Sequence, residues 1–234
     1  TPAMSRIDRW LARMLIAAFA LFALLFSLGP IFEGPDEIEH YRYAQYLAEN
    51  GNFPPPDGQP RGQFHHTPLY YLLASPVLLA IDDTDFAQIA DTTNPYSGFA
   101  FPVPGNDNKT SWVPTRATTE FPYTSPTSRA VHWMRLLNVL AGTLAVWVAY
   151  QCFLLVWPAE PTRVILALGV LAGWQQFAFL SGMVTNDVLV TLAATGALYL
   201  ALWVQRTGQP SVWWALGFGA VLAAALLAKA NGLV

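Results

Sequence analysis

Apolar residues run along this chain in five long blocks, which are separated by short polar connections and by one long stretch rich in proline and polar residues. Each block approaches the roughly 20 residues that a helix needs to cross the hydrocarbon core of a bilayer. The pattern therefore predicts five membrane-spanning helices and one long loop. The predicted spans are about residues 11–32, 130–157, 164–183, 187–204 and 212–228, and the loop is 33–129.

Composition supports the same class of protein. The chain is 54% hydrophobic and 12% charged, with a mean hydropathy of +0.35, which is too apolar for a soluble domain of this length. The formal net charge is −3, and no basic patch with interleaved aromatic residues indicates a nucleic-acid partner. A single cysteine, Cys152, excludes both a disulfide framework and a cysteine metal site. We expect an all-α, polytopic transmembrane fold with short interface helices in the outer loop.

Positive charges predict how the spans are oriented. Three arginines precede the first apolar block, which is longer than a signal-peptide core and is followed by no small-residue cleavage site. Because cationic residues favour the cytoplasmic side of a span, the N-terminus is expected inside. The connections that carry Arg163 and Arg206 then also lie inside, as the same rule requires. We therefore expect a multi-pass protein of the plasma (inner) membrane, with the loop 33–129 and the active site on the outer face.

The stretch that follows the first span is the strongest candidate for chemistry. Residues 32–40 read Phe-Glu-Gly-Pro-Asp-Glu-Ile-Glu-His, which places acidic groups and a histidine where the chain leaves the bilayer. The Gly-Pro pair should end the incoming helix. Asp36 then occupies an N-cap position, with Glu39 at the capping-box position three residues later. A second helix is expected from Asp36 to Asn50, with Gly51 as its C-cap signal.

On this helix, Asp36 and Glu37 lie four and three residues before His40, so two carboxylates and an imidazole share one end. In an ordinary soluble helix, Asp36 and Glu39 would simply cap the helix and His40 would face water. Charge beside a membrane span is costly unless it is paired or used. The position therefore favours a functional site.

A second polar element precedes the apolar segment Leu69–Ile81, which is too short to cross the membrane and should be broken by Pro76. Such a segment is expected along the membrane interface. The histidines His65 and His66 just before it could join Asp36 as metal ligands or hydrogen-bond donors, although adjacent loop histidines are more often solvated.

Polar residues at the ends of later spans fall on the same outer face as Asp36. They are Arg135 at the start of the second span, Asn186 and Asp187 in the turn before the fourth, and Lys229 after the fifth. Arg135 and Lys229 could instead snorkel to lipid headgroups, and Asp187 could cap its helix.

Several short segments of this sequence match one pattern. They are Gly34-Pro35-Asp36-Glu37, His40-Tyr41, His66-Thr67-Pro68-Leu69-Tyr70-Tyr71, Arg135-Leu136-Leu137, Asn186-Asp187, and Lys229 in Leu-Leu-Ala-Lys-Ala-Asn-Gly. Together they resemble the start of C-type glycosyltransferases (the GT-C superfamily). The chain is most similar to bacterial members with a Pro-Asp-Glu-x-x-His signature, and more distantly to protein O-mannosyltransferases and lipid A aminoarabinose transferases. Since such enzymes are usually much longer, residues 1–234 are expected to form a partial, N-terminal module.

The resemblance implies transfer of a sugar from a polyprenyl-phosphate donor to a glycan, lipid or protein acceptor at the outer face, among membrane lipids. Asp36 is the implied catalytic base, assisted by Glu37, with Asp187 as a second acidic residue. Cations at the headgroup level would stabilise the leaving phosphate. The implied substrate-binding residues are His40, His66, Arg135, Asn186 and Lys229.

A divalent metal is compatible with this site without being required. Carboxylate oxygens suit Mg or Mn, and Asp36, Glu37 and Asp187 would supply them.

A transporter or lipid flippase that binds a cation or proton at the acidic cluster is the alternative. Internal repeats, and carboxylates near the membrane midplane, are typical of that class. No convincing repeat is present and the charges lie at span ends, so the sequence favours the enzyme. A degenerate member of the same superfamily acting as an assembly partner is a third hypothesis.

Overall fold

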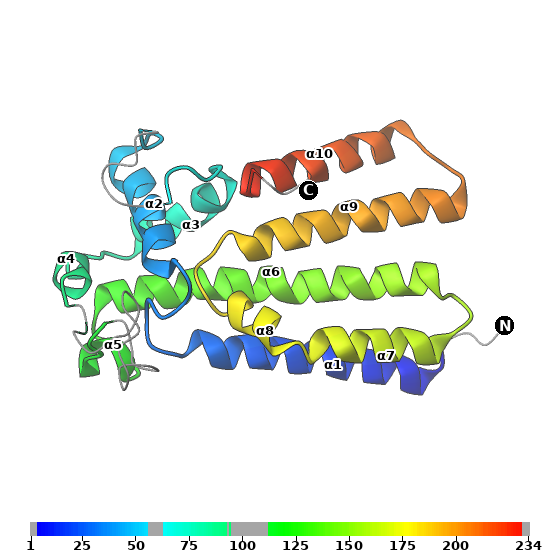
Figure 1. Ribbon diagram of the computed structural model, residues 1–234, viewed down its shortest axis with the longest axis horizontal. Coiled ribbons are helices and arrows are strands. Elements are labelled where there is room, and N and C mark those ends of the chain that lie inside the picture. Colours follow the sequence, from blue (N-terminus) through cyan, green and yellow to red (C-terminus); the bar gives the residue numbers. More distant parts are fainter. Residues whose placement is uncertain (1–3, 56–62, 93, 95–111, 231–234) are drawn as a thin grey trace, which may run out of the picture.

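The computed structural model describes residues 4–55, 63–92, 94 and 112–230, and the regular elements in these ranges are helices (Figure 1). One group of helices lies side by side along the length of the molecule: α1 (Arg6–Ser27), α6 (Pro126–Val156), α7 (Pro161–Ala172), α8 (Gln175–Ser181), α9 (Asp187–Thr207) and α10 (Val212–Ala228). Helix α6 packs against both α1 and α9, and α9 packs against α10. The predicted all-α fold is confirmed.

The remaining helices gather at one end of this bundle (Figure 1). They are α2 (Glu37–Asn50), α3 (Leu69–Ala80), α4 (Phe86–Ala90) and α5 (Arg116–Thr119). The N-terminus and the connections α6–α7 and α9–α10 lie at the opposite end. Arg163 and Arg206 flank those two connections, so the structure places them on the same side as the N-terminus, as the charge pattern predicts.

Three helices in the described residues, α1, α6 and α9, are long and apolar enough to cross a membrane, and the bent pair α7 and α8 gives a fourth crossing if it is counted as one span. Helix α10 coincides with the predicted fifth span but is shorter than these helices. The protein is therefore a multi-pass membrane protein, and the fifth span stays a prediction.

The first span ends earlier than predicted. Helix α1 stops at Ser27 rather than near residue 32, because the sequence holds an earlier Gly29-Pro30 pair. Proline disfavours a helical conformation in the residue before it and cannot continue the hydrogen-bond pattern. Residues 28–36 consequently form an irregular segment with free backbone carbonyls, which become part of the site described below.

The predicted span 164–183 is two helices rather than one. α7 and α8 meet at a bend of 58°. The bend brings Gly182, just after α8, against α1, where a side chain would not fit. A Cβ atom at Gly182 would lie 2.7 Å from the Ala23 carbonyl oxygen and 2.8 Å from the Ser27 nitrogen. The backbones of α1 and of the α8 terminus are therefore in direct contact.

Helix α2 has the predicted extent, and Gly51 ends it in the left-handed conformation that glycine favours. The predicted N-cap contact is wrong. Asp36 has a left-handed backbone, with φ of 53°, and its side chain makes no capping hydrogen bond. Glu39 instead pairs with Arg42 at 2.8 Å, one turn further along the helix.

Helix α3 also differs from the expectation in one respect. Pro76 lies inside the helix without breaking it, and the helix continues to Ala80.

We predict that replacing Gly182 by alanine destabilises the protein by about 1–3 kcal/mol, because the new methyl group meets backbone atoms that cannot rotate away. The control is Gly169→Ala in α7, where an added Cβ meets nothing within 4 Å. That change should be neutral or stabilising by up to about 1 kcal/mol. Thermal unfolding of both variants in detergent measures the difference, and equal stability of the two would contradict the close approach of α8 to α1.

Candidate functional site

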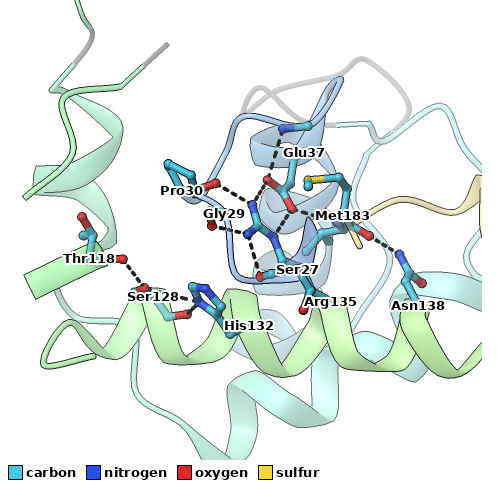
Figure 2. Close-up of polar contacts among 12 residues, drawn as sticks. Ser27, Gly29, Pro30, Glu37, Thr118, Ser128, His132, Arg135, Asn138 and Met183 are labelled. Atoms are coloured by element: carbon cyan, nitrogen blue, oxygen red, sulfur yellow. Dashed lines mark hydrogen bonds and ion pairs between the residues drawn. The ribbon is translucent and has the colours of Figure 1, made fainter. Parts of the chain in front are cut away.

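A buried ion pair joins α2 to α6 (Figure 2). The side chains of Glu37 and Arg135 are both fully buried. The Arg135 Nε donates to Glu37 Oε1 at 2.8 Å, and its Nη2 donates to Oε2 at 2.7 Å. This two-pronged geometry is the strongest that an arginine and a carboxylate form.

The other donors of Arg135 bind backbone carbonyls at the end of α1 and in the segment just after it (Figure 2). Nη1 donates to the oxygens of Ser27 at 3.1 Å and Gly29 at 2.6 Å, and Nη2 donates to that of Pro30 at 2.8 Å. A guanidinium has five N–H groups, and all of them are used. Arg135 has neither a free donor nor exposed surface, so the structure corrects the predicted phosphate contact. Its role is to hold the segment after α1.

Glu37 is occupied in the same way. Beyond Arg135, its carboxylate accepts a hydrogen bond from the Val184 backbone N–H at 2.8 Å and a longer one from the Gly34 N–H at 3.4 Å. No oxygen is left to take a proton from a substrate or to bind a metal ion. The predicted catalytic role of Glu37 is therefore replaced by a positioning role.

Asn138 extends this network, although the sequence analysis did not single it out. Its Nδ2 donates to the backbone oxygens of Met183 and of Thr185, the latter at 2.9 Å, and lies 3.3 Å from the Tyr70 hydroxyl. The signal was present. Asn138 lies three residues after Arg135 on an apolar helix, and polar side chains in such helices usually form hydrogen bonds or have a function.

Asp36, in contrast, is exposed. It lines a cavity of about 290 Å³ formed by residues 32–39 together with Trp112. The left-handed backbone that it adopts is uncommon outside glycine but is tolerated by aspartate and asparagine. Of the two adjacent acidic residues, one is thus locked in the interior and the other faces a cavity.

His40 lies beside this region but does not pair with Asp36. Its Nδ1 is 2.8 Å from the Tyr71 hydroxyl, and its ring stacks on that of His66 at 5.8 Å. Burial, together with the neighbouring His66, lowers the pKa of His40 to about 3. The imidazole is therefore neutral near physiological pH.

His66 connects the predicted site residues electrostatically. Its pKa is lowered, first by burial and then by His65 and Lys229, while Asp187 and Asp36 act in the opposite direction. These charges are close enough to act on one imidazole. Asp36, Asp187 and Lys229, which the predicted topology placed on one face, therefore all act electrostatically on His66.

Asp187 and Lys229 form an ion pair through Oδ1 and Nζ, which ties the start of α9 to the end of α10. Both side chains remain partly exposed, with exposed fractions of 43% for Asp187 and 24% for Lys229. The neighbouring Asn186 is fully buried, and its Nδ2 donates to the Ala228 backbone oxygen at 3.0 Å. Its Oδ1 is buried without a hydrogen-bond partner.

The predicted metal ligands are not assembled into a metal centre. Across the described residues, no group of three or more His, Cys, Asp or Glu side chains is arranged to hold a metal ion. Glu37 is bound to Arg135, and Asp187 to Lys229. The donor set of Asp36, Glu37 and Asp187 therefore does not fit a metal in this arrangement, and dependence on Mg or Mn stays a prediction.

Comparison with known proteins gives one family. A family model described as dolichyl-phosphate-mannose-protein mannosyltransferase matches residues 116–234. No curated protein and no solved structure gives a match. The matched segment runs from α5 through α10 and contains Arg135, Asp187 and Lys229.

We predict that Glu37→Gln lowers the free energy of unfolding by about 3 kcal/mol or more, because it leaves the Arg135 charge buried without a counter-ion. Glu39→Gln is the matched control on the same helix, since its partner Arg42 is partly exposed and such pairs contribute below about 1 kcal/mol. Thermal unfolding of the two variants in the same detergent makes the comparison. A loss in Glu37→Gln no larger than that in Glu39→Gln would remove the structural role assigned to this pair.

Proposed function

The chain belongs to the dolichyl-phosphate-mannose-protein mannosyltransferase family, a GT-C family of membrane glycosyltransferases, and from this premise we propose that it transfers a sugar from a polyprenyl-phosphate donor to an acceptor on the outer face of the membrane. The family match carries this proposal. It favours an enzyme over the alternative of a transporter or flippase. The exposed carboxylate of Asp36 beside a cavity supports the assignment of the reacting group.

In the proposed reaction, Asp36 is the general base. Its carboxylate takes the proton of the acceptor hydroxyl while that oxygen forms a bond to the anomeric carbon of the sugar. The bond from this carbon to the phosphate oxygen breaks, and the polyprenyl phosphate leaves with the electron pair. Asp36 suits this role because it is exposed and forms no ion pair with any residue that the structure describes.

Lys229 is the proposed partner of the leaving phosphate. It is partly exposed on the same face as Asp36, and a cation at this point stabilises the negative charge that develops on the phosphate. Asp187 holds the lysine in place until the donor binds. The phosphate then competes with the Asp187 carboxylate for the Lys229 ammonium group.

Glu37 and Arg135 act on the reaction only through Asp36. Because their ion pair fixes the start of α2 against α6, it also fixes the neighbouring Asp36 at the cavity. A base at the end of a helix needs such a fixed position to stay aligned with the acceptor hydroxyl.

An apolar groove offers a path for the polyprenyl tail. It has a volume of about 210 Å³ and lies between α3, α6 and α9. Its lining includes Tyr70, Leu73, Leu140 and Leu189. Leu189 is in the first turn of α9, close in the chain to Asp187, so a tail in this groove would lead its phosphate toward Lys229.

The proposed orientation follows from the charge pattern. With the N-terminus in the cytoplasm, α2 to α5 and the cluster of Asp36, His66, Asp187 and Lys229 lie on the outer side of the plasma membrane. A glycan, lipid or protein hydroxyl would reach Asp36 from that side. His40, His66 and Asn186 remain the proposed substrate-binding residues.

We predict that Asp36→Asn lowers the rate of sugar transfer by about 100-fold or more, because an amide cannot accept the proton and positioned proton transfer contributes at least that much. Folding should be preserved, since asparagine tolerates the left-handed backbone of position 36 as well as aspartate does. The measurement is turnover of a polyprenyl-phosphate mannose by the intact protein, together with its thermal unfolding.

Glu39→Gln is the control for this experiment, because Glu39 lines the same cavity but pairs with Arg42. Its turnover should stay within a few-fold of the parent. Normal turnover in Asp36→Asn would remove the base from this position and leave Asp187 as the acidic residue to be tested.

We predict that Lys229→Gln weakens binding of the polyprenyl-phosphate donor by roughly 10-fold, since a charge-assisted hydrogen bond to phosphate is lost. Lys229→Arg should retain most of the affinity. Arg206→Gln is a control at the opposite end of α9, where the proposal places no phosphate. Equal donor affinity in Lys229→Gln and in the parent would return Lys229 to a purely structural partner of Asp187.

A further inference from the structure

A second cavity lies between the end of α1 and the start of α6, and the proposed reaction does not use it. Its volume is about 400 Å³. The walls come from three segments: Leu24, Ser27 and Leu28 of the α1 end, Phe121, Pro122 and Tyr123 before α6, and Arg129, His132, Trp133 and Leu136 of α6. It shares no lining residue with the Asp36 cavity or with the groove beside α3.

The cavity opens toward the membrane. Leu28, Phe121 and Trp133, which line it, are all largely exposed, and they lie where the two membrane-spanning helices α1 and α6 reach the end of the bundle that carries α2 to α5. Apolar side chains in this position face lipid rather than water. The walls therefore suit hydrocarbon chains that enter from the side.

One polar atom in the cavity wall is left without a partner. The ring of His132 is about nine-tenths buried, and its Nδ1 donates to the Ser128 backbone oxygen at 2.7 Å (Figure 2). Because a carbonyl oxygen only accepts, this contact fixes the neutral ring with its acceptor lone pair on Nε2. Nε2 is buried and has no hydrogen-bond partner. A buried acceptor of this kind is costly unless a ligand or water supplies a donor.

A positive charge lies one turn before this histidine. Arg129 is exposed, lines the same cavity and pairs with no carboxylate among the residues that the structure describes. Residues three apart on a helix share a face, so Arg129 and His132 can contact the same ligand.

We propose that this cavity binds an anionic phospholipid whose headgroup carries a free hydroxyl group. The acyl chains lie along the apolar walls from α1 and α6, the phosphate lies at Arg129, and the headgroup hydroxyl donates to His132 Nε2. Tyr123 stacks on the His132 ring at 4.0 Å and is only partly buried. It is the part of the wall that must shift slightly for the hydroxyl to reach the nitrogen.

The site is adjacent to the reaction centre through one helix. Arg135 follows His132 by three residues and holds the end of α1, where Ser27 and Leu28 also line the cavity. A lipid in the cavity therefore stabilises the same segment that the buried ion pair fixes. This inference does not depend on the proposed sugar transfer.

The test uses the intact protein in detergent and native mass spectrometry with pairs of competing short-chain lipids. Phosphatidylglycerol has the negative charge and the hydroxyl, phosphatidylethanol has the charge without the hydroxyl, and phosphatidylcholine has neither a net charge nor a hydroxyl. The parent protein should prefer phosphatidylglycerol over phosphatidylethanol by about fivefold, the effect of one neutral hydrogen bond. It should prefer either anionic lipid over phosphatidylcholine by roughly tenfold.

Two variants separate the contributions. His132→Phe keeps the stacking on Tyr123 and should abolish the preference for phosphatidylglycerol over phosphatidylethanol while leaving phosphatidylethanol bound. Arg129→Gln changes an exposed residue and should remove the preference for anionic lipids while keeping the effect of the hydroxyl. Arg116→Gln is a control, since this exposed arginine lies outside the cavity and pairs with Glu120.

Equal binding of the three lipids by the parent protein would overturn the proposal without any variant. So would an unchanged preference for phosphatidylglycerol in His132→Phe. Binding of the deacylated headgroup, glycerophosphoglycerol, as tightly as the lipid would overturn the role of the apolar walls. No sugar donor is present in these measurements, so a failure of the proposed transferase activity would leave their outcome unaffected.

Discussion

The end of the bundle that carries α2 to α5 depends on a single buried guanidinium. Arg135 holds the Glu37 carboxylate, the last carbonyl of α1 and two carbonyls just after α1, and the same carboxylate accepts a hydrogen bond from the Val184 N–H before α9. A charge in a low-dielectric interior is tolerated only when such partners surround it. Moving any one of these segments away from Arg135 would therefore raise the free energy of the folded protein substantially. One side chain on α6 therefore fixes the ends of α1, α2 and α9 relative to one another.

The catalytic proposal follows from this constraint. Because Glu37 is drawn inward to Arg135, the adjacent Asp36 is left at the surface, at the edge of a cavity. On the neighbouring helices, the ion pair of Asp187 and Lys229 stays partly exposed, and the proposal uses its cation to bind the phosphate. In the proposed reaction, the buried pair thus supplies rigidity and the exposed groups carry the chemistry.

Helix α6 carries three polar side chains at intervals of three residues, and each contacts a different part of the molecule. His132 lines the cavity beside α1, Arg135 holds α2, and Asn138 holds the loop before α9 through the carbonyls of Met183 and Thr185. The exposed apolar residues of α6 face the membrane. Polar groups in a membrane helix persist only where they find partners, which explains why these three mark the contacts of α6 with the end of the bundle that carries α2 to α5.

The sequence alone determined the helices and their relative sides, because a bilayer demands long apolar segments and arginines mark one side of them. It also predicted that Asp36, Asp187 and Lys229 share one face of the membrane. It could not show that Glu37 is buried and Asp36 exposed, since two adjacent carboxylates look alike until a partner is known. That partner, Arg135, is 98 residues away from Glu37, and only the packing of α6 against the segment after α1 decides which carboxylate it takes. The same packing leaves Arg135 no hydrogen bond for a phosphate, a fact that no local pattern records.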